Sequence, residues 1–200
     1  MARKEGQRYV GRGGDKLKAA IDEFGLALRG VMAADFGCNV GGFTDCLLQE
    51  GAARVYAVDA GYGALEWKLR TDERVIVMER TNAMHVQLPE PAEVIAVDVA
   101  WTRQHHILPS ALRQLTPSGL VLSLFKPQYE ADPSQVRRGI VMSEEFQPVL
   151  EATLAGLAAQ GIPVRQVVQL PRTERSKNPE AFLHIVGADC HASAPGGGPG

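Results

Sequence analysis

A glycine-rich turn between two carboxylates carries the clearest chemical signal in the sequence. The turn lies in DFGCNVGGFT, which begins at Asp35, and a second apolar segment ends at Asp59, about 20 residues further on. Gly37, Gly41 and Gly42 allow the backbone to turn sharply and to approach a ligand closely. The two oxygens of Asp59 can accept hydrogen bonds from both hydroxyls of a ribose. This spacing predicts a nucleoside-binding site.

Asp35 indicates which nucleoside is bound. A dinucleotide site usually has the pattern GxGxxG and directs a helix N-terminus at a pyrophosphate, whereas this turn has the pattern GxxxGG with an acid before it. A carboxylate disfavours a diphosphate and attracts the sulfonium and ammonium groups of S-adenosylmethionine, directly or through water. A glycine turn that binds no ligand is the alternative. Together with Asp59, the turn favours S-adenosylmethionine as the cofactor.

The expected cofactor site extends beyond the two acids. Cys38 is interpreted as a small, weakly polar turn residue rather than a nucleophile, and Asn82 is either an adenine contact or a simple turn residue. The predicted cofactor-binding residues are Asp35, Gly37, Cys38, Asn39, Gly41, Gly42, Phe43, Asp59 and Asn82.

Two further ionisable residues end apolar segments. Asp98 closes VIAVD, and Lys126 closes LVLSLFK. In an open α/β sheet, ligands bind outside the carboxyl ends of the strands, so we expect both side chains in that crevice. The residues alone favour a catalytic pair and a purely structural ion pair equally.

The hydrophobic pattern shows how these residues could be positioned. Segments typical of strands alternate with segments typical of helices, which indicates a doubly wound sheet. Strands are expected at 32–36, 55–59, 75–79, 94–98, 120–126, 164–170 and 182–186. Helices are expected after Asp15, a candidate N-cap, and at 42–49, 65–70, 104–115 and 144–159.

The connection between the last two predicted strands is too short for a parallel crossover, which needs a dozen or more residues. These two strands are therefore expected to be antiparallel. The predicted fold class is α/β: a doubly wound, Rossmann-like sheet of seven strands, mostly parallel with the last strand antiparallel. This is the sheet of S-adenosylmethionine-dependent methyltransferases.

Composition describes one globular domain. The chain has 200 residues, of which 45% are hydrophobic and 22% charged, and a net charge of −2. We expect a flexible basic N-terminus over 1–10, one folded domain over 11–188 and a disordered tail over 189–200. The cluster of basic residues near the N-terminus would attract a phosphate backbone, or it is only a solvated tail.

Several classes of protein are not expected. The sequence has no apolar run long enough to span a membrane, and its N-terminus is polar rather than secretory, so a cytoplasmic location is expected. Cys38, Cys46 and Cys190 lack the spacing of a disulfide framework or a zinc site, so no metal is expected.

An ordered set of motifs resembles the TlyA (hemolysin A) family of RNA ribose methyltransferases, part of the FtsJ-like superfamily. The motifs are GRGGDKL, DFGCNVGGFTDCLLQEGA, VYAVDAGYG, WKLR, ERTN, KPQYE and SKNPEAFLHI, and they span roughly residues 9–187. The resemblance implies a catalytic Lys-Asp-Lys-Glu set, which matches Lys16, Asp98, Lys126 and Glu180 here. A surface helix charge and a loop carboxylate are the alternatives for Lys16 and Glu180.

The resemblance implies methyl transfer to a ribose 2′-hydroxyl of RNA, with ribosomal RNA or a ribosomal subunit as the expected partner. The family usually has a small N-terminal RNA-binding domain, and the residues before the matched region are too few for one. The segment after Asp98 also departs from the family and reads VAWTRQHH, where Trp101 either stacks on a base or packs internally.

These departures leave two alternatives open. One is an S-adenosylmethionine-dependent methyltransferase acting on a small molecule. The other is a non-catalytic RNA-binding protein with a methyltransferase fold, against which the four matched residues argue.

Overall fold

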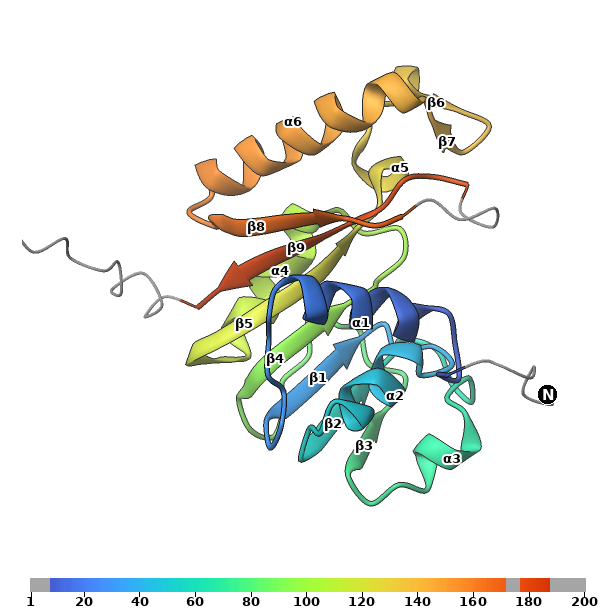
Figure 1. Cartoon of the computed structure of the whole chain (residues 1–200), viewed down its shortest axis with the longest axis vertical. Coiled ribbons are helices and arrows are strands. Elements are labelled where there is room, and N and C mark those ends of the chain that lie inside the picture. The colour runs from blue at the N-terminus through green and yellow to red at the C-terminus, as the bar shows by residue number, and fades with distance from the viewer. Residues whose placement is uncertain (1–7, 172–176, 188–200) are drawn as a thin grey trace, which may run out of the picture.

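A seven-stranded sheet forms the centre of the computed structural model, which describes residues 8–171 and 177–187 (Figure 1). Its strand order is β3-β2-β1-β4-β5-β9-β8. The strands are β1 (Met32–Phe36), β2 (Arg54–Val58), β3 (Val75–Met78), β4 (Ala92–Val97), β5 (Leu115–Phe125), β8 (Val164–Gln169) and β9 (Ala181–Val186). Neighbouring strands are parallel except β9, which is antiparallel to both β5 and β8. The predicted fold class, with its reversed last strand, is confirmed.

Helices cover both faces of the sheet. Figure 1 shows α1 (Gly13–Glu23) and α2 (Gly42–Gln49) on one face and α4 (Gln104–Arg113) behind the sheet. The remaining elements are α3 (Trp67–Arg70), α5 (Pro127–Glu130), α6 (Phe146–Ala159), the 3-10 turns η1 (Pro133–Gln135) and η2 (Ser143–Glu145), and a small hairpin of β6 (Val136–Arg137) and β7 (Ile140–Val141).

Side chains of the central strands alternate between two hydrophobic clusters. Ala33 and Val55 belong to the cluster under α1 and α2, whereas Ala34 and Tyr56 belong to the cluster that includes residues of α4 and α6. All four are fully buried. A strand with both faces covered has no polar alternation, which explains the continuous apolar runs in the sequence.

The first helix begins earlier than the sequence predicts. Its N-cap is Arg12, so the predicted N-cap, Asp15, lies within the first turn. Tertiary packing explains the difference, because Gly14 lies against the fully buried ring of Tyr9 and its N–H donates to the carbonyl of Gly11 (3.1 Å). Asp15 still interacts favourably with the helix dipole from this position.

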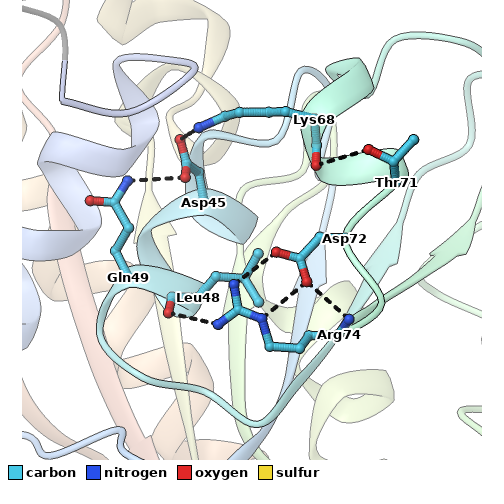
Figure 2. A network of polar contacts seen from close by, with 7 residues as sticks. All are labelled: Asp45, Leu48, Gln49, Lys68, Thr71, Asp72 and Arg74. Atoms are coloured by element: carbon cyan, nitrogen blue, oxygen red, sulfur yellow. Dashed lines mark hydrogen bonds and ion pairs between the residues drawn. The ribbon is translucent and has the colours of Figure 1, made fainter.

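Asp45 ties the N-terminal segment and α3 to α2. Its carboxylate accepts hydrogen bonds from the backbone N–H of Val10 (2.8 Å), from Gln49 Nε2 (3.0 Å) and from Lys68 Nζ (2.9 Å). Figure 2 shows the side-chain part of this network. Tyr9 and Val10, assigned to the flexible N-terminus from sequence, are therefore part of the folded unit. Residues 1–7 and the predicted tail, 189–200, lie outside the described residues.

Within the described residues, none of the helices combines the length and the apolar character needed to cross a membrane.

Two glycine-to-alanine changes should shift stability in opposite directions. A Cβ at Gly14 would lie 2.3 Å from Cγ of Tyr9, whereas a Cβ at Gly156, in α6, would meet nothing within 4 Å. We expect Gly14→Ala to lower the free energy of unfolding by about 1–3 kcal/mol through overpacking. Gly156→Ala should raise it by about 0.5–1 kcal/mol, because alanine loses less entropy in a helix. Urea denaturation measures both, and changes of the same sign would contradict the packing at Gly14.

Candidate active site

The glycine turn after β1 brings the carboxyl ends of three strands together. Gly37 has a φ of +90°, and a Cβ at this residue would lie 2.5 Å from the carbonyl oxygen of Asp98, after β4. The N–H groups of Gly37 and Cys38 both donate to the carbonyl of Val58, at the end of β2 (2.9 and 3.0 Å). Only glycine combines this φ with so close an approach to the backbone of another strand.

Asp35 anchors the helix that follows the turn. Its side chain is fully buried, and Oδ2 accepts hydrogen bonds from the N–H (2.8 Å) and the Oγ1 (2.7 Å) of Thr44, in the first turn of α2. Burial raises the pKa of Asp35 to about 7, although the bonds from Thr44 oppose the rise. Oδ1 is buried without a hydrogen-bond partner in the described structure.

A cavity of about 820 Å³ opens over the turn. At one side Asp59 accepts hydrogen bonds from the N–H groups of Asn39 (2.8 Å, to Oδ2) and Gly61 (2.6 Å, to Oδ1). Each carboxylate oxygen retains a further lone pair for a ligand. Asn82 lines the cavity too, and its Oδ1 accepts from the N–H of Met84 (2.9 Å), so it is both a turn residue and a cavity residue.

The structure brings most of the predicted cofactor-binding residues to this cavity. Those that line it are Asp35, Gly37, Cys38, Asn39, Gly42, Phe43, Asp59 and Asn82. Gly41 does not, since a Cβ there would point at Leu69 (2.3 Å from Cδ1) in α3. Burial raises the pKa of the Cys38 thiol, which fits the interpretation of this residue as a non-nucleophilic part of the turn.

A cationic nucleoside fits this first cavity. The unpartnered Oδ1 of Asp35 offers a carboxyl oxygen to a cation. Asp59, about 20 residues later in the chain, offers acceptors for ribose hydroxyls. A Cβ at Gly37 would collide with the backbone of Asp98, so this position of the turn requires glycine. Among the described residues, no cluster of three or more His, Cys, Asp or Glu side chains could hold a metal ion.

A second cavity of about 870 Å³ adjoins the first, and Arg12 and Lys16 line both. Its lining also includes an apolar wall, made of Trp101, Tyr129, Val136, Leu170 and Pro171. Trp101 is 87% exposed with a φ of +60°, and its ring centroid lies 5.3 Å from that of Tyr129. Trp101 is therefore a surface aromatic rather than an internal packing residue.

The four residues of the predicted catalytic set meet where the cavities join. Lys126, directly after β5, forms an ion pair with Asp98, directly after β4. Lys16, on α1, forms an ion pair with Glu180, directly before β9. Asp98 and Lys126 line the first cavity, and Glu180 lines the second. Burial raises the pKa of the Asp98 carboxyl, while the charges of Lys126 and Lys16 oppose the rise.

A buried polar network, missed by the sequence analysis, holds this pair in place. The side chain of Gln104, at the start of α4, donates to the carbonyl of Leu124 (3.2 Å) and accepts from Ser123 Oγ (2.6 Å). The Gln104 N–H donates to Oε1 of Glu130 (2.7 Å), and burial raises the pKa of that carboxyl. The network joins the segment after Asp98 to the strand that ends before Lys126. In the sequence, only Glu130, the acid within KPQYE, pointed to this network.

Comparison with known proteins gives a family and several relatives. The family model of the FtsJ-like methyltransferases matches residues 9–187. The chain is 40% identical over 184 residues to a Bacillus subtilis protein named "Putative rRNA methyltransferase YqxC", covering 89% of this chain and 66% of that protein. It is 38% identical over 140 residues to the Mycobacterium tuberculosis "16S/23S rRNA (cytidine-2'-O)-methyltransferase TlyA", covering 68% of this chain and 52% of that protein.

A solved structure is also similar. The "Putative hemolysin from Streptococcus thermophilus" superposes with a TM-score of 0.86 at 36% identity, covering 94% of this chain and 70% of that one. The family resemblance stated from sequence is confirmed. The chain spans about two-thirds of the length of the first of these curated relatives and about half of the second.

Asp35 should make stability depend on pH. Its pKa of about 7, against an ordinary 3.8, means that the folded protein binds this proton more tightly than the unfolded chain. The contribution of Asp35 to the free energy of unfolding therefore falls as pH rises from about 4 to about 7. Asp35→Asn keeps an acceptor for Thr44 but does not titrate.

As pH rises from about 4 to about 7, we expect the free energy of unfolding of Asp35→Asn to increase relative to that of the wild type. The increase should be at most roughly 1.4 kcal/mol per pH unit. Urea denaturation at a series of pH values measures the difference, in which titrations common to both proteins cancel. Parallel stability curves would show that Asp35 keeps its ordinary pKa in the folded protein.

Proposed function

Because this chain belongs to the FtsJ-like methyltransferase family, we propose that it transfers a methyl group from S-adenosylmethionine to a ribose 2′-hydroxyl of RNA. The observation that carries the proposal is the meeting of Lys16, Asp98, Lys126 and Glu180 at the junction of two cavities. One cavity suits a cationic nucleoside, and the other has room for an acceptor nucleotide. A transferring methyl group must pass between two such spaces.

The first cavity is proposed to hold the cofactor. Asp59 would accept hydrogen bonds from the ribose hydroxyls. Asp35 would attract the cationic end of the cofactor, because a nearby cation favours the ionised form of a buried carboxyl. The turn from Cys38 to Phe43 would contribute its backbone and Asn82 a contact near the base. When bound, the cofactor supplies an electrophilic methyl group, which needs no metal for activation.

The residues at the junction have separable roles. Lys126 would orient the 2′-hydroxyl, and once its ammonium group has lost a proton to solvent, the free amine would accept the hydroxyl proton at Nζ. Asp98, its ion-pair partner, would hold the side chain in position. Glu180 holds Lys16 across the junction, where Lys16 would stabilise developing negative charge. Because Lys126 and Asp98 are largely shielded from water, with side chains 16% and 28% exposed, their interaction is stronger than that of a surface pair.

Ribosomal RNA is the proposed substrate. The Mycobacterium tuberculosis relative is named as a ribosomal RNA cytidine-2′-O-methyltransferase, and its similarity extends over 140 residues. An RNA of this kind also suits a site whose acceptor cavity is lined by an exposed aromatic side chain and cationic groups. We propose that the protein acts in the cytoplasm, on ribosomal RNA or on a ribosomal subunit.

The position of the transferred methyl group tests the acceptor directly. RNA incubated with the protein and methyl-labelled cofactor is digested to nucleosides, and the label is expected on a ribose 2′-oxygen. Label confined to a base, or found only in a small molecule, would rule out the proposed acceptor.

Lys126→Ala should abolish most of the transfer. Loss of a general base typically lowers a rate by about 10²–10⁴-fold, and we expect a fall of this size at saturating RNA and cofactor. Lys18→Ala is the matched control, since Lys18 pairs with Asp22 and Glu50 and lines neither cavity. The single-turnover rate of methyl transfer is measured, with circular dichroism to check folding. Full activity in folded Lys126→Ala would remove this residue from the mechanism.

A further inference from the structure

Two cationic side chains line both cavities, and they differ in their partners. Lys16 is paired with Glu180. Arg12, one turn earlier at the N-cap of α1, has no hydrogen bond or ion pair from its guanidinium group to any residue that the structure describes, and its side chain is exposed. Its charge is therefore available to a ligand that reaches the junction.

The two cavities also differ in charge. Among the described residues that line the first cavity, the charges of Lys126 and Asp98 cancel, and Lys16 is neutralised by Glu180. Asp59 then remains beside Arg12, together with Asp35 in its ionised form. That balance suits a cation. Among its described lining residues, the second cavity retains two cations, Arg12 and Lys177, against one acid, Asp15, once the Lys16–Glu180 pair is set aside. That balance suits an anion.

We propose that Arg12 binds the RNA phosphate next to the ribose that is methylated, an inference that rests on the proposed function. The target 2′-oxygen must lie at the junction to receive the methyl group. In RNA the neighbouring ribose carbon carries the 3′ phosphodiester, so a phosphate must lie close to the same point. The planar guanidinium group matches two phosphate oxygens at once and remains charged at any physiological pH.

The carboxylate of the cofactor is the rival anion for Arg12, because Arg12 lines the first cavity as well. The acid-rich balance of that cavity argues against it. The placement of Lys177 in the second cavity, with the apolar wall that includes Trp101 and Tyr129 beside it, fits a ligand that has phosphates and a base.

Arg12→Ala tests the assignment, with Arg29→Ala as a matched control that removes the same charge from a surface residue outside both cavities. We expect Arg12→Ala to raise both the Kd and the KM for ribosomal RNA by about 10-fold or more. The Kd for S-adenosylmethionine, measured by calorimetry, should stay within about twofold. The slope of log Kd for RNA against log salt should become shallower by about 0.7–0.9. Arg12→Lys should recover only part of the affinity, because it lacks the planar fork.

Two results would overturn the proposal. A weaker Kd for S-adenosylmethionine with unchanged RNA binding would assign Arg12 to the cofactor carboxylate. RNA and cofactor affinities equal to those of Arg29→Ala would leave Arg12 without a ligand. RNA binding is measured by filter binding, which does not depend on methyl transfer. The affinities of Arg12→Ala and Arg29→Ala can therefore be compared even in a preparation that transfers no methyl group. Absence of transfer by the wild type would instead count against the proposed function.

Discussion

Two lysine–carboxylate pairs between two cavities are the feature on which the rest of the structure depends. A lysine and an acid that are largely shielded from water are costly unless they pair, so Lys126 and Asp98 must be held in contact. Their backbone positions are at the ends of neighbouring parallel strands, β5 and β4, which supply that contact without a flexible loop. Lys16 and Glu180 form the second pair from α1 and the residue before β9, and so fasten the helix over the same edge of the sheet.

The surrounding elements hold this arrangement in place. Gly37 allows the turn to touch the Asp98 backbone, and Asp35 fixes the helix that follows. On the other side, Gln104 joins the segment after Asp98 to β5 through buried hydrogen bonds. A buried polar network of this kind is stiff, because breaking one bond leaves a buried group without a partner. The site is thus built mainly from strand ends and helix starts, which vary less in position than loops do.

Much of this arrangement could be predicted from the sequence. The bounds of β1 and α2 agree with prediction because an apolar run ends at a glycine turn in each case. Other features depend on contacts between distant segments. The start of α1 follows from the packing of Gly14 on Tyr9, and β5 begins at Leu115 rather than Leu120, with Pro117 and Gly119 inside it, where β4 shifts register between Ala92 and Val94. The sequence also gives no sign that Arg12 lacks an acidic partner among the described residues, because that depends on which acids lie nearby in the fold.

A double-mutant cycle on Asp98 and Lys126 tests the central claim that the two side chains act as one unit. The single-turnover rate of methyl transfer is measured for the wild type, Asp98→Ala, Lys126→Ala and the double variant. Residues that act together show strongly non-additive losses, so the double variant should be no slower than the slower single variant, within about threefold. Losses that multiply would show that the two side chains contribute independently, and the account of the junction would be wrong.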